Sequence, residues 1–380
     1  MSRQSLLHTL AQYWQNIQTT LFPFLEQVGL PLTPQFQRLV AILDLLRIEE
    51  LAPKRLFRVG AKPKDRILLA RAFLAKHFLN QPDTKAFHAR LQTDDTLRRI
   101  CGWPSPTAMP CYATFTRAFA VFADLGLADL VHDARVKEWF GDTLIWHQAL
   151  DATDIPARER ANPNPEPQYG YTASGKRRKH PLTGRPKGRP KKDEEVAKPQ
   201  TRIERQLTQA PEIALLDISM RCDTGCKPDP EGHLHYWKGY KFHVITNEDR
   251  VPLCAITTAA SVHDSQVAIP LMQLAARRVT ALYDLQDSGY AAAAIHTCSQ
   301  QLGHVPIIKK SAAPNAPAPE MEPDRARHYT GRTVAEHFNA RLKDEAGGRM
   351  IRVRGIRKVH THLMFGLLVI FADALLNLAA

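Results

Sequence analysis

Residues 237–259 read WKGYKFHVITNEDRVPLCAITTA, and this stretch decides how the second half of the chain is expected to fold. Two β-rich runs, 237–246 and 251–259, flank the turn-forming segment NEDR, which predicts a β-hairpin. Further along the chain, the pattern predicts strands at 279–285 and 305–308 and helices at 264–277, 291–302, 331–345 and 358–378. A hairpin followed by alternating strands and helices is typical of an α/β sheet with helices on its faces.

The pattern changes on the N-terminal side of this region. Residues 144–153, LIWHQALDAT, predict one more strand, which carries the acid Asp151. Residues 1–140 have apolar side chains at helical spacing, for example Phe115, Phe119 and Phe122, and nothing in them looks catalytic. We therefore expect an all-α N-terminal domain at 1–140 with its own core, followed by an α/β domain at 141–380.

The composition narrows the class of protein. Lys and Arg number 51 against 38 for Asp and Glu, so the formal net charge is +13. A charge this far from zero favours a polyanionic partner, nucleic acid before membrane. Six cysteines in 380 residues do not indicate a disulfide scaffold, and they fit a reducing cytoplasm. The N-terminus has no apolar segment of the kind found in secretory signals. The apolar stretch 364–380 contains Asp373 and is shorter than a membrane span, so we expect it to form a buried helix.

A polar stretch at 156–206 interrupts the second domain. It is rich in Pro, Lys, Arg and Glu, and we interpret it as a mobile basic insertion because it has too little apolar surface to form a core. Its segment 174–192 has nine Lys or Arg and no acid. The Gly-Arg-Pro cores around Arg185 and Arg189 resemble AT-hooks, whose Arg side chains enter narrow A·T minor grooves. A solvated basic linker is the alternative interpretation.

Three parts of the second domain carry the candidate chemistry. Asp151 ends the first predicted strand, and Asp287 follows the strand at 279–285 and precedes Ser-Gly-Tyr. Residues 329–343 spell Tyr-x2-Arg-x3-Glu-x6-Lys, with Tyr329, Arg332, Glu336 and Lys343 as the signature residues. On a helix, the last three of these lie near one face. A carboxylate between two cations is suited to a metal ion and a phosphate backbone together.

The Tyr-Arg-Glu-Lys signature, together with the two acids before it, resembles the DDE transposases of bacterial insertion sequences. Segments 237–243, 260–264 and 352–360 are also similar to that family, and so are segments 97–102 and 113–117 of the helical region. The resemblance covers about residues 87–375. It implies an RNase H-like fold, in which a mixed sheet has flanking helices. It also implies that the first Asp lies on the central strand, that the second Asp follows the fourth strand and that the Glu lies on a nearby helix. Some relatives carry a large β insertion where this chain has a Pro-rich loop at 309–328.

The resemblance also implies an activity. Asp151, Asp287 and Glu336 are expected to hold two Mg²⁺ or Mn²⁺ ions, with Asp151 bridging both, for hydrolysis at a transposon end and transfer of the freed 3′-hydroxyl into target DNA. Tyr329, Arg332 and Lys343 are expected to grip transposon-end phosphates. Further DNA contacts are expected from Lys238, Lys241, Arg354, Arg185 and Arg189. The implied active complex is a homodimer on DNA, in the cytoplasm at the nucleoid.

Several alternatives stay open at this point. Asp284, inside the strand at 279–285, is a rival for the second metal ligand. Cys222 and Cys226 with His233 and His235 invite a zinc hypothesis, although their spacing is not that of a standard finger. Two other functions fit the same features: a decayed or domesticated relative that binds DNA without catalysis, and an RNase H-type nuclease that does not join strands.

Overall fold

A six-stranded mixed sheet forms the centre of the part of the chain that follows the N-terminal helices. The structure is a computed structural model, and it describes residues 2–30, 32–53, 65–161, 200–228, 231–310 and 319–379. The strand order is β2-β3-β1-β5-β6, and β4 pairs with β3 off this path. The strands are β1 (Leu144–Pro156), β2 (Asp223–Pro228), β3 (Leu234–Asn247), β4 (Pro252–Ala259), β5 (Thr280–Gln286) and β6 (Val305–Ile308).

Strand β1 lies in the middle of this sheet. It pairs antiparallel with β3 and parallel with β5, and β5 pairs parallel with β6. The predicted hairpin is present as β3 and β4, and Asn247 organises its turn by accepting the N–H groups of Asp249 and Val251. The expected fold class is confirmed: an α/β mixed sheet with flanking helices, consistent with an RNase H-like domain, follows an all-α N-terminal region.

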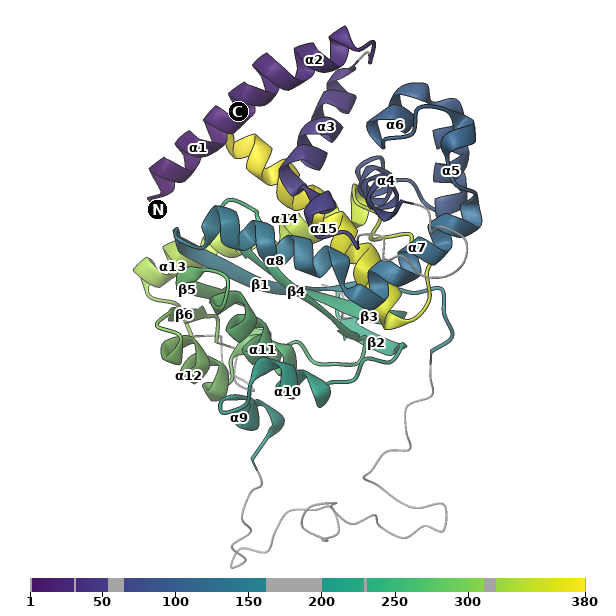
Figure 1. Cartoon of the computed structure of the whole chain (residues 1–380). Helices are drawn as coiled ribbons and strands as arrows, with labels where there is room; N and C mark the ends of the chain where they lie inside the picture. Colours follow the sequence, from purple (N-terminus) through teal and green to yellow (C-terminus); the bar gives the residue numbers. More distant parts are fainter. Residues whose placement is uncertain are drawn as a thin grey trace, which may run out of the picture.

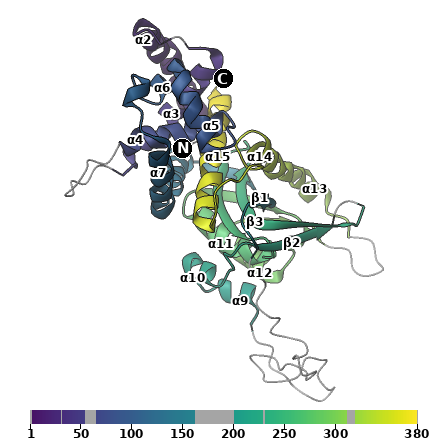
Figure 2. The same cartoon turned by 90° about the vertical axis from the view of Figure 1, so that its right-hand side faces the viewer.

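Helices cover both faces of the sheet (Figure 1). On one face, α11 (Ser265–Ala276) and α12 (Ala293–Gln301) contact the strands through pairs such as Met272 with Gln286. On the other face lie α13 (Pro323–Tyr329), the short 3-10 helix η5 (Thr330–Arg332), α14 (Thr333–Asp344) and α15 (Ile356–Ala379). Figure 2 shows α13 and α14 beside β1 and β3 on this second face.

The N-terminal region is helical, as predicted. Side-chain caps fix several of the starts: Thr33 accepts the N–H of Phe36, and Asp83 accepts the N–H of Ala86. Gly126, in the left-handed conformation, ends one helix and begins the next. The helices are α1 (Arg3–Asn16), α2 (Phe22–Gln27), α3 (Pro34–Leu46), α4 (Arg66–Phe78), α5 (Thr84–Thr93), α6 (Asp95–Ile100), α7 (Tyr112–Leu125) and α8 (Leu127–Phe140).

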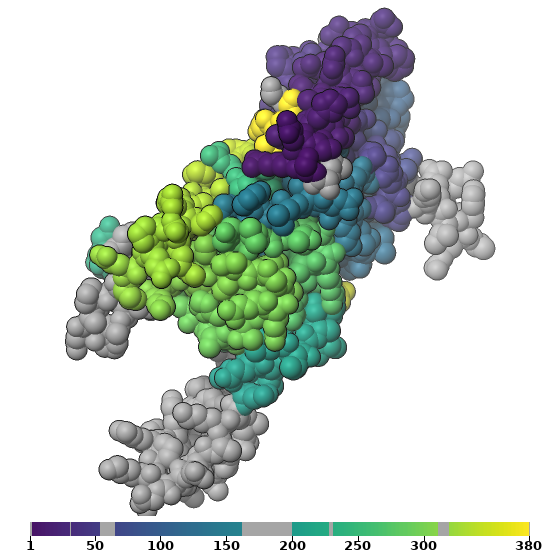
Figure 3. Space-filling view, turned by 90° about the vertical axis from the view of Figure 1, so that its left-hand side faces the viewer, coloured from purple at the N-terminus to yellow at the C-terminus, as the bar shows by residue number. Residues whose placement is uncertain are grey.

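Helix α15 connects this region to the sheet. It contacts α1, α3, α4, α7 and α8 on the helical side and β4 on the other, and one hydrophobic cluster runs through both halves. The expectation of a separate N-terminal core is therefore wrong, because the last helix of the chain fills it. By length and composition α15 could cross a membrane, but 78% of its apolar window is buried in the fold, which identifies a core helix. Figure 3 shows the purple N-terminal helices resting on the green body of the sheet region.

Three segments differ from the sequence-based expectation. Helices α9 (Arg202–Gln206) and α10 (Pro211–Leu216) follow the basic stretch, and the amide of Gln206 donates to the carbonyl of Gln266, so the stretch expected to be mobile ends before residue 206. Strand β2 was not predicted. Helix α13 begins inside the predicted loop 309–328 and ends one residue after it. Residues 162–199, with Arg185 and Arg189, lie outside the described residues.

Candidate active site

The register of two parallel strands brings the first two acids together. Ala149 of β1 pairs with Leu285 of β5, so Asp151 and Asp287 each lie two residues beyond a paired position. Because side chains alternate along a strand, both acids project from the same face as Ala149 and Leu285. Asp287 comes directly after β5, at the carboxyl end of that strand.

Small residues let the helix with the third acid approach this face. Ala335 of α14 packs with Ala149 and Leu285 in a small buried cluster. A Cβ atom on Gly331 would lie 3.1 Å from the Leu285 Cδ1 atom, so the glycine permits close contact at the start of the helix. Glu336 follows Ala335 directly. One turn after Ala335, the Asn339 Nδ2 atom donates to Asp151 Oδ2 over 3.0 Å.

The three carboxylates influence one another. Burial raises the pKa of Asp151 to about 6, and the nearby charges of Asp287 and Glu336 push it in the same direction. The N–H of Ala152 and the guanidinium of Arg332 act against this rise. Strand and helix geometry therefore place all three acids and Arg332 in one electrostatic neighbourhood.

Each acid already has a partner within the protein. Asp151 accepts from Asn339, and Asp287 Oδ1 accepts the N–H of Gly289 over 2.8 Å. The guanidinium of Arg332 forms an ion pair with Glu336 and also lies 5.9 Å from the ring centre of Tyr329. Arg332 thus supplies the positive charge beside the carboxylates.

The side chains are not arranged as a finished metal site. In the described part of the chain, no set of three or more His, Cys, Asp or Glu lies close enough together to hold a metal ion, contrary to the expected tight cluster of carboxyls. Three neighbouring carboxylates repel one another, and Arg332 draws Glu336 to itself. The chemistry of the donors nevertheless fits Mg²⁺ or Mn²⁺, because these hard cations prefer carboxylate oxygens.

Asp284 belongs to a different network. Gln148 and Ser299 donate to its two oxygens, and the His304 Nδ1 atom lies 3.1 Å from Asp284 Oδ2. Asp284 is 2% exposed. It lies three residues before Asp287, and Gln148 lies three residues before Asp151, so both point to the opposite face of the sheet. The alternative of Asp284 as second metal ligand is therefore contradicted.

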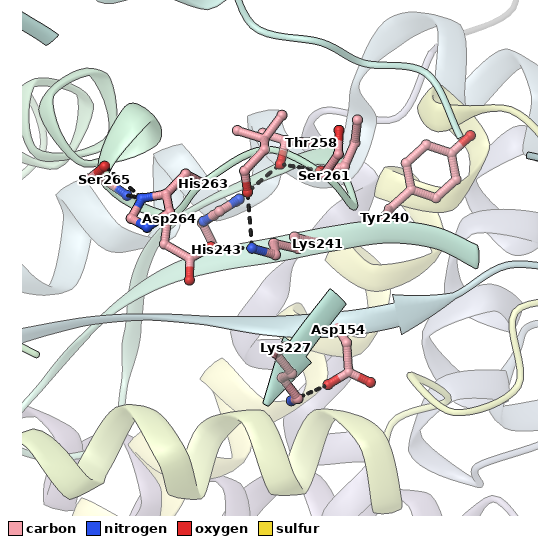
Figure 4. Close-up of polar contacts among 12 residues, drawn as sticks. Asp154, Lys227, Tyr240, Lys241, His243, Thr258, Ser261, His263, Asp264 and Ser265 are labelled. Atoms are coloured by element: carbon pink, nitrogen blue, oxygen red, sulfur yellow. Dashed lines mark hydrogen bonds and ion pairs between the residues drawn. The ribbon is translucent and has the colours of Figure 1, made fainter. Parts of the chain in front are cut away.

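The predicted phosphate and DNA contacts lie in different settings. The Lys343 Nζ atom is 2.8 Å from Asp154 Oδ1, and the pKa of Tyr329 is raised, mainly by burial. The Lys241 Nζ atom is 2.9 Å from both Asp264 Oδ1 and the Val262 carbonyl oxygen, so its charge is satisfied inside the protein (Figure 4). Two more predicted contacts, Lys238 and Arg354, are exposed.

The zinc hypothesis finds no support among the described residues. Cys222 is buried, 4.0 Å from the carbonyl oxygen of Glu159. Cys226 is exposed in β2, opposite Tyr236. Neither cysteine belongs to a set that could hold a metal ion.

Sequence reasoning missed two residues at this site. Asn339 could have been noticed, because it follows Glu336 by three residues on the same helix. Tyr290 was less accessible to prediction: it is 1% exposed, and its hydroxyl has no hydrogen-bond partner among the described residues. Burial raises the pKa of Tyr290, and the charges of Asp264, Asp151 and Asp287 raise it further.

A cavity of about 680 Å³ adjoins the site and has Tyr329 in its wall. Three cations, Lys309, Lys310 and Arg325, and two acids, Glu320 and Glu322, line it. The cavity wall therefore carries both signs of charge, with the cations in slight excess.

Residues 221–372 match the family model described as the transposase DDE domain. The matched segment includes Asp287, Tyr329, Arg332, Glu336 and Lys343, whereas Asp151 precedes it. The match supports a DDE transposase. Neither the search of curated proteins nor that of solved structures found a match.

Proposed function

We propose that the protein is an insertion-sequence transposase that cuts DNA at transposon ends and joins the freed ends to target DNA. The observation that supports this most is the proximity of Asp151 to Asp287 and Glu336, two acids of the matched family segment whose charges act on the Asp151 carboxyl. The exposed Lys238 and Arg354 and the net charge of +13 suit DNA as the partner.

Different residues of the site have different roles in the proposed reaction. Asp151, Asp287 and Glu336 would hold two Mg²⁺ or Mn²⁺ ions. When bound, the ions activate a water molecule or a 3′-hydroxyl and stabilise the leaving oxygen of the phosphodiester. Glu336 becomes available as Arg332 transfers its guanidinium from the carboxylate to a DNA phosphate. Tyr329 and Lys343 hold neighbouring phosphates of the same DNA end.

Hydrolysis and strand joining take place one after the other at the same site. In the first reaction a water oxygen attacks phosphorus, the P–O3′ bond breaks, and a 3′-hydroxyl is released. In the second, that hydroxyl attacks a phosphodiester of the target, which releases a target 3′-hydroxyl. The N-terminal helices, 1–140, would recognise ends or form the homodimer in the active complex, which acts in the cytoplasm at the nucleoid.

The first prediction tests the third acid. The DNA that flanks the coding sequence supplies candidate ends, cloned around a marker gene on a plasmid and incubated with the protein, Mg²⁺ and a target plasmid. Glu336→Gln is expected to reduce both cleavage and joining at least 100-fold, because an amide is a poor ligand for a hard cation. DNA binding in a gel shift is expected to stay near the wild-type level.

Glu345→Gln provides a matched control. Glu345 lies on the carboxyl end of the same helix, is similarly exposed, and also pairs with an Arg four residues earlier, Arg341. Cleavage by Glu336→Gln at the rate of Glu345→Gln would contradict the assignment of Glu336. Cleavage without joining by the wild type would point to a nuclease, and DNA binding without cleavage to a non-catalytic relative.

A further inference from the structure

Two lysines from distant parts of the chain meet at one carboxylate oxygen beside the candidate site. The Lys227 Nζ atom lies 3.0 Å from Asp154 Oδ1, and the Lys343 Nζ atom lies 2.8 Å from the same oxygen. Lys227 comes from β2, Asp154 from β1 and Lys343 from α14. Figure 4 shows Asp154 and Lys227 on the side of β1 that faces the pale yellow-green helix, α14.

This group stands at a definite distance from the acids. Asp154 follows Asp151 by three residues of strand, about 10 Å. Regular alternation would direct it away from α14, but its contact with Lys343 shows that its carboxylate reaches the α14 side near the end of β1. Lys343 follows Glu336 by seven residues of helix, also about 10 Å. The strand and the helix therefore shift the lysines from the carboxylates by similar amounts.

Charge and exposure leave the group open to an anion. Two lysines and one carboxylate have a net charge of +1, and the charge of Asp154 also acts on the exposed Arg349 nearby. The Lys227 side chain is 56% exposed, against 15% for Asp154. Each ammonium has three N–H donors and uses one on Asp154, so donors of Lys227 face solvent.

We propose that Lys227 joins Lys343 in a phosphate-binding site for the DNA backbone beside the candidate active site, with Asp154 holding both ammonium groups in place. This proposal rests on the proposed function. It assigns a DNA contact to β2, a strand otherwise seen only as an addition to β3. It also explains why a half-exposed lysine of β2 is directed toward α14.

The test measures binding of a 30-base-pair duplex to the full chain at several salt concentrations, without divalent metal. Lys227→Ala is expected to weaken binding at 0.1 M salt several-fold and to lower the slope of log K against log salt by about 0.9, the value for one phosphate. Lys227→Arg is expected to keep the wild-type slope. Lys137→Ala is the matched control, because Lys137 is similarly exposed and pairs with Asp133 on α8, away from this group.

Asp154→Asn separates a DNA contact from a purely structural ion pair. Asn keeps an oxygen acceptor for the lysines but removes the negative charge, so this variant is expected to bind DNA more tightly at low salt. A slope for Lys227→Ala equal to that of Lys137→Ala, or weaker binding by both Asp154→Asn and Lys227→Ala, would overturn the proposal. If the wild type itself bound the duplex without salt dependence, the proposed function would fail first.

Discussion

At the residue scale, two aspartates three positions apart have opposite roles. Asp287 lies beside Asp151 on the face covered by α14, whereas Asp284 is buried among Gln148, Ser299 and His304 on the other face. The difference follows from the alternation of side chains in β5. A carboxylate whose oxygens accept buried hydrogen bonds stabilises the fold, and one at the end of a strand is free to bind a ligand.

The second prediction tests this difference. Asp284→Ala removes the acceptor for buried donors, and we expect it to lower the free energy of unfolding by about 3 kcal/mol. Asp287→Ala loses one hydrogen bond to a backbone N–H at a partly exposed position, and we expect a loss of about 1 kcal/mol or less. Urea unfolding followed by circular dichroism measures both. Equal losses would contradict the separation into structural and ligand-binding acids.

Contacts between residues far apart in the sequence were the part of the site that could not be predicted from local patterns. Asp151 and Asp287 are 136 positions apart, the same offset as the register of β1 on β5, but only the family signature indicated which acids to pair. The contact of Lys343 with Asp154 could not be foreseen, because it depends on where α14 crosses β1. Lys227 reaches the same oxygen only because β2 pairs with β3, which no local pattern reveals.

At the element scale, apolar alternation predicted five of the strands but not β2. The sequence of β2, DTGCKP, has no apolar alternation and contains both Gly and Pro, so it forms a strand only by pairing with β3. Gly225 in this strand faces the indole of Trp237, which would lie 2.3 Å from an added Cβ atom. Similarly, α13 was missed because its Pro and charged residues resemble a loop, while its contacts are with β5 and β6.

The third prediction concerns the base of the β2–β3 hairpin. Gly239 has a φ of 151°, and a Cβ atom there would lie 2.1 Å from the carbonyl oxygen of Ile155, where β3 meets the end of β1. We expect Gly239→Ala to push the strands apart and to lower the free energy of unfolding by about 2 kcal/mol. Hydrogen exchange should rise at the backbone amides of residues 223–227.

Gly232→Ala is the control for this prediction. Gly232 also has a positive φ, 88°, but an added Cβ atom would have no neighbour within 4 Å among the residues that the structure describes. Only backbone strain of about 1 kcal/mol is therefore expected. If Gly239→Ala destabilised the protein no more than Gly232→Ala, the close approach of β3 to β1 would not be a constraint on the fold.

At the scale of the whole molecule, α15 makes the helical region and the sheet one body. Its apolar sequence predicted a buried helix, but it contained no information on which elements bury it. Polar groups reinforce this contact: the ring of His360 lies 2.8 Å from Asp129 Oδ1 on α8 and 2.8 Å from Thr257 Oγ1 on β4. The two halves should therefore unfold together.

The last prediction is a loss of stability in mild acid, because several histidines are buried without charge. Burial lowers the pKa of His132 and His362 to about 3 and that of His243 to about 4. In the unfolded chain these rings bind protons near pH 6.5, so between about pH 6.5 and 4 the unfolded state takes up more protons than the folded state. Each such ring then lowers the free energy of unfolding by up to about 1.4 kcal/mol per pH unit.

Two groups modify this dependence. Asp151, with a pKa raised to about 6, takes up a proton in the folded state as the pH falls, which offsets about one histidine in this window. The charge of Asp129 raises the pKa of His360 in the folded protein, although burial acts against this rise. The ion pair of His360 with Asp129 therefore adds fully to the free energy of unfolding below pH 6.5, and this stabilisation is lost as the pH rises through the pKa of His360 in the folded state. Stability should therefore be greatest near pH 6.5–7.

Urea unfolding at intervals from pH 5 to 8 measures this profile, and His243→Gln isolates one of its causes. Gln can still hydrogen bond to Thr258, the partner of the His243 ring, but it cannot bind a proton. The variant should be less stable than the wild type at pH 7 because the packing changes, yet its free energy of unfolding should fall less steeply below pH 6.5, by up to about 1.4 kcal/mol per pH unit. Parallel profiles for the two proteins would show that His243 is not held neutral by the fold.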